Sequence, residues 1–241
     1  MTIQVQRAEY SEVESLRDLY RQEVDCQLIH DSALGRGIAD AYLLLVDGAV
    51  AGYAGVWNKY DPHRIMEFYV LPQRRTLAQP MFRALVASSR ATSMEAQTNS
   101  PLMLLMLYDH ATAITAENYL FADAEVTHLP SPGGVFRQAT PGDQEPGGEW
   151  VIDLDGTLVA AGGFLCHYNP PYGDIYMSVT EGFRRQGFGS FIVQELKRVC
   201  YEAGRKPSAR CNAGNVWSRR TLEKAGLLPC GRLLTGALGG A

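Results

Sequence analysis

The sequence has no long apolar run. Its longest apolar stretches, Ala41–Val46 and Leu102–Leu107, are strand-sized and fall far short of the roughly 18 residues that cross a membrane. The first ten residues alternate polar and apolar side chains, without the basic-then-apolar order of a signal peptide. We therefore expect a cytoplasmic protein with no membrane partner.

Cysteine and histidine are sparse. The five cysteines are odd in number, and no two of them form a Cys-x-x-Cys pair. This argues against a disulfide framework or a zinc site, and for a reducing compartment. The five histidines show no spacing typical of metal ligands. The sequence therefore predicts no metal site.

Basic runs are also missing. None exceeds two residues, and the net charge of the chain is −4, which disfavours a nucleic-acid partner. The part up to His128 has 10 Lys and Arg against 16 Asp and Glu, whereas the part from Leu129 has 12 against 10. The part of the chain from Leu129 is therefore better suited to bind an anionic ligand.

One short stretch, Arg184–Ser190, lies between a strand-like run and a helical pattern. The strand is predicted at Asp174–Val179, and the helix has apolar residues at Phe188, Phe191, Ile192, Leu196, Val199 and Cys200. A helix start offers unpaired backbone N–H groups, and glycines at 187 and 189 let an anion approach them. We predict a site for a phosphate-bearing ligand.

Two common phosphate-binding patterns are absent from this stretch. The Walker pattern needs Gly-Lys-Ser/Thr, and the dinucleotide fingerprint needs a third glycine where Ile192 stands. What remains is Arg-x-x-Gly-x-Gly, which resembles the acetyl-CoA loop of the GNAT superfamily of N-acetyltransferases. Asn215–Leu227 resembles the later segment of that family, in which an Asn opens a helix that ends in Lys-x-Gly and an apolar residue. Without any family, Asn215 is also a favourable N-cap residue, and Gly226 is favourable just after the end of a helix.

The resemblance implies acetyl-CoA as co-substrate. The loop amides would hold the pyrophosphate, and free backbone groups of the preceding strand would hold the pantetheine arm and the thioester oxygen. The residues implied in this binding are Met177, Ser178, Val179, Arg184, Arg185, Gln186, Gly187, Phe188, Gly189, Ser190 and Asn215.

The resemblance also implies acetyl transfer to an amine, which requires a held thioester and a deprotonated nucleophile. Asp174 lies nearest the family's general base, although a one-residue register difference would turn it to the other face. Many members of the family use a Tyr of the last helix as the acid for the departing thiolate, and Leu222 stands at that position here. Tyr176, Tyr168 or Tyr172 are candidate acids, Cys211 is a further pocket candidate, and each also suits ordinary packing.

We therefore predict an acetyl-CoA-dependent N-acetyltransferase whose acceptor is a primary amine of a small molecule or peptide. The alternative is a non-catalytic acyl-CoA-binding or interaction module, favoured by the missing Tyr. The chain could act as a monomer or as a homodimer.

Part of the sequence recurs later in the same chain. A shift of 108 positions aligns Asp47 with Asp155, Gly48 with Gly156, Gly55 with Gly163, Tyr60 with Tyr168 and Pro62 with Pro170, and a shift of 110 then aligns Arg74-Arg75 with Arg184-Arg185. We infer two copies of one unit, 1–128 and 129–241, with the boundary in the Pro- and Gly-rich segment 129–148. In the first copy Leu77 and Gln79 replace the two glycines, so we expect that copy to have lost the cofactor loop.

The predicted fold is α/β (α+β), with two tandem GNAT-like units, each a mixed and mostly antiparallel sheet flanked by helices. Hairpins are predicted around Asp47-Gly48 and Asp155-Gly156. Further strands are expected at 3–6, 67–71, 102–108 and 135–139, helices at 13–20, 32–40, 80–89 and 113–121, and one more helix between Asn215 and Gly226.

Overall fold

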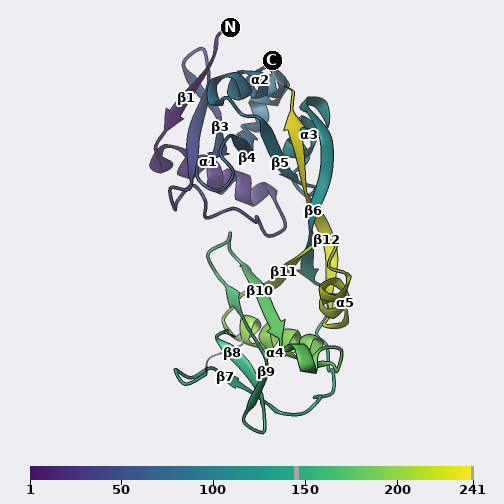
Figure 1. Cartoon of the computed structure of the whole chain (residues 1–241). Coiled ribbons are helices and arrows are strands. Elements are labelled where there is room, and N and C mark those ends of the chain that lie inside the picture. Colours follow the sequence, from purple (N-terminus) through teal and green to yellow (C-terminus); the bar gives the residue numbers. More distant parts are fainter. Residues whose placement is uncertain (144–146, 240–241) are drawn as a thin grey trace. The chain divides into compact units, whose positions relative to one another are not determined.

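The computed structural model describes residues 1–143 and 147–239, which form two compact units (Figure 1). Unit 1 comprises Met1–Glu117 and Gly231–Ala241, and unit 2 comprises Asn118–Cys230. Of the predicted boundary segment 129–148, residues 144–146 lie outside the described part of the chain. Most of the last strand therefore lies in unit 1, although it belongs to the second sequence copy, 129–241.

Unit 1 contains one mixed sheet with strand order β1-β2-β3-β4-β5-β12-β6. Its β4–β5 pair is parallel, while β1–β2, β2–β3, β3–β4 and β5–β12 are antiparallel. The elements are β1 (Ile3–Ala8), α1 (Tyr10–Glu23), β2 (Ala39–Val46), β3 (Ala49–Trp57), β4 (Arg64–Val70), the 3₁₀ turn η1 (Pro72–Leu77), α2 (Ala78–Ser89), β5 (Ser93–Gln97), α3 (Pro101–His110), β6 (Ala111–Asp123) and β12 (Leu227–Leu238).

Helices cover both faces of this sheet. Apolar residues of α2 and α3, such as Phe82 and Met106, form one core with strand residues, and those of α1, such as Val13, form a second core. Arg17 of α1 is fully buried and pairs with Glu67 at 2.9 Å and Asp31 at 3.1 Å. Removal of any one of these groups would leave a buried charge without its partner, which is strongly destabilising.

Unit 2 repeats the order with strands β6-β11-β10-β9-β8-β7. Its remaining elements are β7 (Val135–Gln138), β8 (Trp150–Leu154), β9 (Thr157–Leu165), β10 (Tyr172–Val179), the 3₁₀ turn η2 (Glu181–Phe183), α4 (Phe188–Glu202), β11 (Lys206–Asn212) and α5 (Val216–Lys224). Helix α4 packs on β8, β9 and β10 (Figure 1), and its apolar side chains enclose one core with them.

Both predicted hairpins are confirmed. Asp47 and Gly48 have φ of 49° and 80°, and Asp155 and Gly156 have φ of 52° and 83°. Two successive left-handed residues match the twist of antiparallel strands, which is why Asp-Gly favours this turn.

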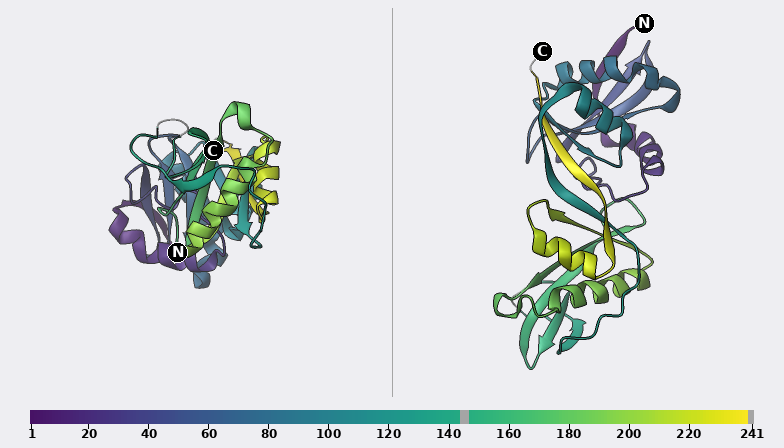
Figure 2. Two further views of the ribbon diagram at one scale, coloured as in Figure 1. Left: turned by 90° about the horizontal axis from the view of Figure 1, so that it is seen from below. Right: turned by 90° about the vertical axis from the view of Figure 1, so that its right-hand side faces the viewer.

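Three predicted elements are wrong. Residues 102–108 form helix α3 instead of a strand, and residues 113–121 form strand β6 instead of a helix. Residues 32–37 form turns, with Gly37 at φ 64°, and β2 begins at Ala39. Strand β6 owes its conformation to partners far away in the sequence, since β12 lies beside it (Figure 2) and β11 pairs with it at residues 118–122.

Candidate functional site

The loop between β10 and α4 has two left-handed residues. Arg185 has φ 62° and Gly187, the N-cap of α4, has φ 97°. No side chain caps the helix start at Gly187, so the first amides of α4 stay available as donors. Left-handed residues in a turn can bring neighbouring N–H groups to one concave side, which suits an anion.

The two glycines of the loop are required for different reasons. Gly187 needs its left-handed φ, which costs a residue with a Cβ about 1–2 kcal/mol. Gly189 lies in the first turn of α4, where an added Cβ would stand 3.1 Å from Cγ2 of Thr221. Gly189 therefore allows α4 to pack closely on α5, a role that the sequence pattern did not reveal.

Strand β10 separates from β11 before it reaches the loop. The parallel pairing of these strands runs from Tyr172 with Lys206 to Ile175 with Ala209. On its other edge β10 continues to pair with β9 as far as Val179. The β11-facing backbone groups of Met177, Ser178 and Val179 thus lie beyond the paired segment, where a ligand can use them.

Helix α5 begins beside this opening. The side chain of its N-cap, Asn215, accepts a hydrogen bond from the amide of Ser218 at 3.0 Å. The predicted capping role is confirmed. Asn215 also lines the cavity described next, so a second role toward a ligand is sterically available.

A cavity of about 850 Å³ joins the loop, β10 and α5. The residues that line it are Met177, Ser178, Val179, Arg184, Arg185, Gly187, Gly189, Ser190, Asn215, Trp217, Ser218, Arg220, Thr221 and Lys224. Nine of the eleven residues predicted to bind the cofactor are in this set. Four of its members are cationic, and among the described residues that line it none is Asp or Glu, so the cavity favours an anionic ligand.

The two other predicted binding residues face elsewhere. Phe188 is 2% exposed and packs in the core of unit 2. The side chain of Gln186 donates to the carbonyl of Gly182 at 3.1 Å. Either residue could reach an anion through its backbone N–H alone.

Sequence reasoning missed the α5 side of the cavity, namely Trp217, Ser218, Arg220, Thr221 and Lys224. A signal was present, because residues 217, 220, 221 and 224 have the spacing of one helix face. An indole and two cations on one helix face directly after Asn215 would have indicated that this face lies beside the ligand.

The structure does not bring Asp174 into this cavity. Its carboxylate is buried and lies 3.4 Å from Nε of Arg210. Arg210 in turn donates to the hydroxyl of Tyr168 at 2.6 Å, and burial together with Asp174 raises the pKa of Tyr168 to about 12. Asp174, Arg210 and Tyr168 therefore form one connected polar group at the paired end of β10.

Tyr176 leans toward β9. A Cβ added at Gly163, its direct partner across the strands, would stand 2.7 Å from the Tyr176 hydroxyl. The side chain is 37% exposed, and desolvation and then Glu149 raise the pKa of its hydroxyl. The hydroxyl is thus placed over β9, away from the opening between β10 and β11.

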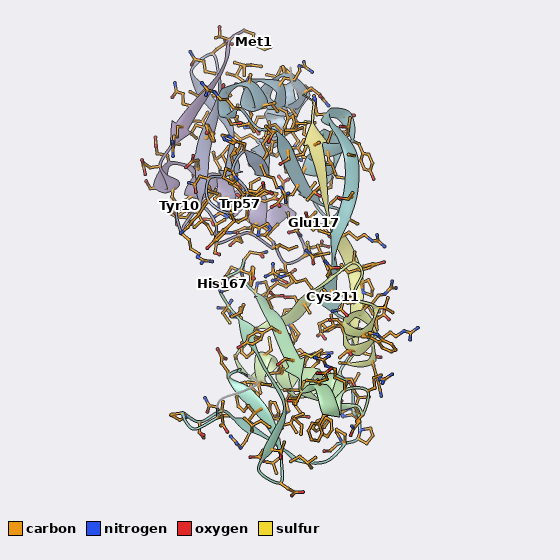
Figure 3. The ribbon with its side chains drawn as sticks, viewed as in Figure 1. Met1, Tyr10, Trp57, Glu117, His167 and Cys211 are labelled. Atoms are coloured by element: carbon orange, nitrogen blue, oxygen red, sulfur yellow. The ribbon has the colours of Figure 1, made fainter. Side chains whose placement is uncertain are left out.

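The remaining candidates are buried. Cys211 lies on β11 (Figure 3) with 7% exposure, and burial raises the pKa of its thiol. Tyr172 is 6% exposed. Leu222, at the family's Tyr position, is 3% exposed and packs in the core of unit 2. All three contribute to packing.

The corresponding loop of unit 1 is built differently. Strand pairing aligns Gly52–Val70 with Ala160–Val179, and the helices α2 and α4 begin at Ala78 and Phe188. Among the described residues 71–89 none has a positive φ. The Gln79 side chain bonds to Asp109 and to Nε2 of His110, the latter at 2.7 Å, so in the first turn of α2 it is already engaged by α3.

Unit 1 has a small polar cavity of about 20 Å³, room for about one water molecule. Its lining includes Glu67, Glu95 and His30. Trp57, labelled in Figure 3, donates its indole N–H to Glu95 at 3.4 Å. This cavity is too small for a cofactor.

Comparison with known families agrees with this geometry. The profile described as "Acetyltransferase (GNAT) domain" matches residues 10–124, and that described as "Acetyltransferase (GNAT) family" matches residues 113–227. The chain therefore belongs to the GNAT acetyltransferase family and carries two GNAT domains in tandem. No curated relative matches the chain by sequence.

Solved structures share the fold. A GNAT-family acetyltransferase from Colwellia psychrerythraea is 15% identical with a TM-score of 0.82, covering 98% of this chain and 100% of that one. A GCN5-related N-acetyltransferase from Sphaerobacter thermophilus is 15% identical with a TM-score of 0.59, covering 99% and 97%. A tandem GNAT protein from the clavulanic acid biosynthesis pathway is 13% identical with a TM-score of 0.59, covering all of both chains.

Two features are absent from the described ranges, residues 1–143 and 147–239. No helix there has the length and apolar character needed to cross a membrane. No three His, Cys, Asp or Glu side chains gather there as a group that could hold a metal ion.

Proposed function

We propose that the protein is an acetyl-CoA-dependent N-acetyltransferase whose donor site is the cavity of unit 2. The observation that supports this most is the combination of the uncapped α4 start, the two left-handed loop residues and four lining cations in one cavity. A diphosphate fits these donors. The backbone of Met177–Val179 would hold the pantetheine arm and polarise the thioester carbonyl.

In the proposed reaction the acceptor amine attacks the thioester carbonyl. A C–N bond forms, the C–S bond breaks, and the amine loses a proton while the leaving thiolate can gain one. A thiol has an ordinary pKa of about 8.5, so the thiolate can leave without an acid. We propose Asp174 and Tyr176 for proton transfer because they lie on one face of β10 directly before Met177–Val179; since neither side chain lines the cavity, the proton would pass through water. Within the Asp174–Arg210–Tyr168 group, the positive charge of Arg210 would compensate the negative charge of Asp174.

The pH dependence of kcat/KM tests these two residues. Asp174→Asn should abolish the acidic limb of the profile, and Tyr176→Phe should change the alkaline limb. Unchanged profiles in both variants, with unchanged rates, would remove both residues from the mechanism.

The alternative is a non-catalytic acyl-CoA-binding module. Leu222 in place of the family's Tyr and the position of the Tyr176 hydroxyl over β9 favour it. Both functions predict binding of acetyl-CoA. Only the acetyltransferase predicts release of free thiol when acetyl-CoA is mixed with a broad panel of primary amines and peptides.

Thermal unfolding tests the donor site itself. A ligand that binds the native state raises its stability, so acetyl-CoA should raise the Tm of the wild type. Gly187→Val and Gly189→Val should abolish that rise, while Leu77→Val and Gln79→Val in unit 1 should keep it. No shift in the wild type at millimolar acetyl-CoA would contradict the proposal.

We propose that the two sequence copies are 1–128 and 129–241, and that the first has lost its cofactor loop. The five free cysteines favour a reducing compartment such as the cytoplasm. The proposed partners are a small-molecule or peptide amine and no nucleic acid, with the chain as a monomer or homodimer.

A further inference from the structure

Two cysteines of unit 2 lie on neighbouring elements, and neither is among the described residues that line the cavity. Cys166 is exposed and directly follows the last residue of β9. Cys200 is fully buried near the end of α4, which packs on β9 and β10. A small oxidant in solution therefore meets Cys166 before it meets Cys200.

Gly173 of β10 leaves space between these two thiols. Leu165 pairs with Asp174, so one step further along the same hairpin Cys166 stands opposite Gly173. A Cβ added at Gly173 would stand 2.8 Å from Sγ of Cys200. Cβ positions of directly opposite residues on antiparallel strands are about 4.5–5.5 Å apart. The Cys200 sulfur thus occupies the space beside Cys166 that a side chain at position 173 would fill.

The side chain of Cys166 points toward α4. Residues two apart on a strand share a face, and Phe164, two positions before Cys166, packs in the core that α4 covers. Burial and then the charge of Cys166 raise the pKa of the Cys200 thiol to about 12, and Arg205 opposes them. Cys200 is therefore a protonated thiol at neutral pH, within electrostatic range of Cys166.

We propose that Cys166 and Cys200 form an oxidation site, at which hydrogen peroxide joins the two thiols in a disulfide. One peroxide oxygen bonds to the Cys166 sulfur, giving a sulfenic acid, and the other leaves as water. The Cys200 sulfur then attacks the Cys166 sulfur, so an S–S bond forms and the S–O bond breaks. The departing hydroxide takes the thiol proton and leaves as a second water. The two sulfurs lose two electrons in total, which reduce the peroxide.

The disulfide would join the end of α4 to the end of β9, and a dithiol would reverse it by exchange. In a reducing compartment such bonds are typically transient and respond to oxidants. The inference does not depend on the proposed function, because neither thiol belongs to the donor site.

Thiol counting after peroxide treatment of the full chain tests the site. In the wild type the number of thiols titrated after denaturation should fall from five to three, since one disulfide consumes two. Peptide mass spectrometry should find Cys166 joined to Cys200 within one chain, and dithiothreitol should restore all five thiols. Cys166→Ser, a change at an exposed position, should keep its four thiols under the same treatment.

Cys230→Ser is the matched control, because Cys230 is the other exposed cysteine of the described chain. It should still form the Cys166–Cys200 bond. Cys200→Ala should leave a Cys166 sulfenic acid that dimedone traps, and thermal unfolding shows whether each variant is folded. Five remaining thiols in the treated wild type would overturn the proposal, as would a disulfide from Cys166 to Cys230 or to a second chain.

Discussion

Arg184 lies against the end of its own strand, with 3.2 Å between its Nε and the carbonyl oxygen of Val179. In unit 1, Arg75 makes the same contact with Val70, also at 3.2 Å. The last carbonyl of the equivalent strand therefore accepts from an arginine in both copies, which matches Arg75 with Arg184, one position off the shift of 110 that matched it with Arg185. Helix α4 begins at Phe188, four residues after its arginine, whereas α2 begins at Ala78, only three residues after its own.

That one-residue difference accounts for the divergence of the two loops. In unit 2 the extra residue allows the left-handed turns at Arg185 and Gly187. In unit 1 the chain passes through η1 directly into α2. Unit 1 thus lacks the loop conformation of unit 2, both because its loop is one residue shorter and because no glycine stands between Leu71 and Gln79.

Gly189→Ala should destabilise unit 2 by about 1–3 kcal/mol, because the added Cβ would stand 3.1 Å from Cγ2 of Thr221 and push α4 away from α5. Thr221→Ser removes that methyl group. The double variant G189A/T221S should therefore regain most of the loss in urea unfolding. If it were no more stable than G189A alone, the contact would not be the reason for the glycine.

Asn215→Ala should cost about 1 kcal/mol of unfolding free energy, since the Ser218 amide loses its cap. Asn215→Ser should retain the cap and most of that stability. Acetyl-CoA affinity separates the two roles of Asn215. A contact with the pantetheine arm predicts weaker binding by both variants, whereas equal binding by Asn215→Ser and wild type would reduce the residue to a cap.

Lys197→Met should destabilise unit 2 by about 3 kcal/mol. The buried ammonium lies 2.8 Å from Asp123 and donates to the carbonyls of Glu125 and Ala225. Its removal leaves the mostly buried Asp123 carboxylate without its cation. The double variant K197M/D123N should be closer to the wild type in urea unfolding, and additive losses would contradict this account.

Stability should fall as pH rises from about 4.5 to about 8 because of Glu95. Burial raises the pKa of its carboxyl group to about 8, against the opposing effect of Arg64 and Trp57, and Nε2 of His30 lies 3.3 Å away. The unfolded state ionises near its ordinary pKa of about 4.3, so it releases a proton that the folded state keeps. Glu95→Gln should therefore gain Tm relative to the wild type between about pH 5 and 8. A difference in Tm that stays constant over this range would contradict the buried-acid account.

The sequence was most informative where structure is set locally. The Asp-Gly hairpins, the strand before the loop and the capped helix at Asn215 depend on nearby residues, and all are present in the structure. The loop residues were also found to line one cavity with β10. Glycine spacing between a strand and a helix was sufficient to locate this part of the candidate site.

Elements set by distant partners could not be predicted in this way. Helix α3 is apolar on every side, so its sequence has no helical period, although Pro101 in its first turn was an available signal. Strand β6 looks helical locally and is held in a sheet by β11 and β12. The closeness of Gly189 to Thr221 likewise depends on how α4 and α5 pack.

Amide hydrogen exchange with and without acetyl-CoA tests the central claim most directly, because it reports on backbone N–H groups in both loops at once. The account predicts slower exchange at residues 185–190 on addition of acetyl-CoA and no change at residues 72–80. Protection at 72–80, with residues 185–190 unaffected, would contradict it.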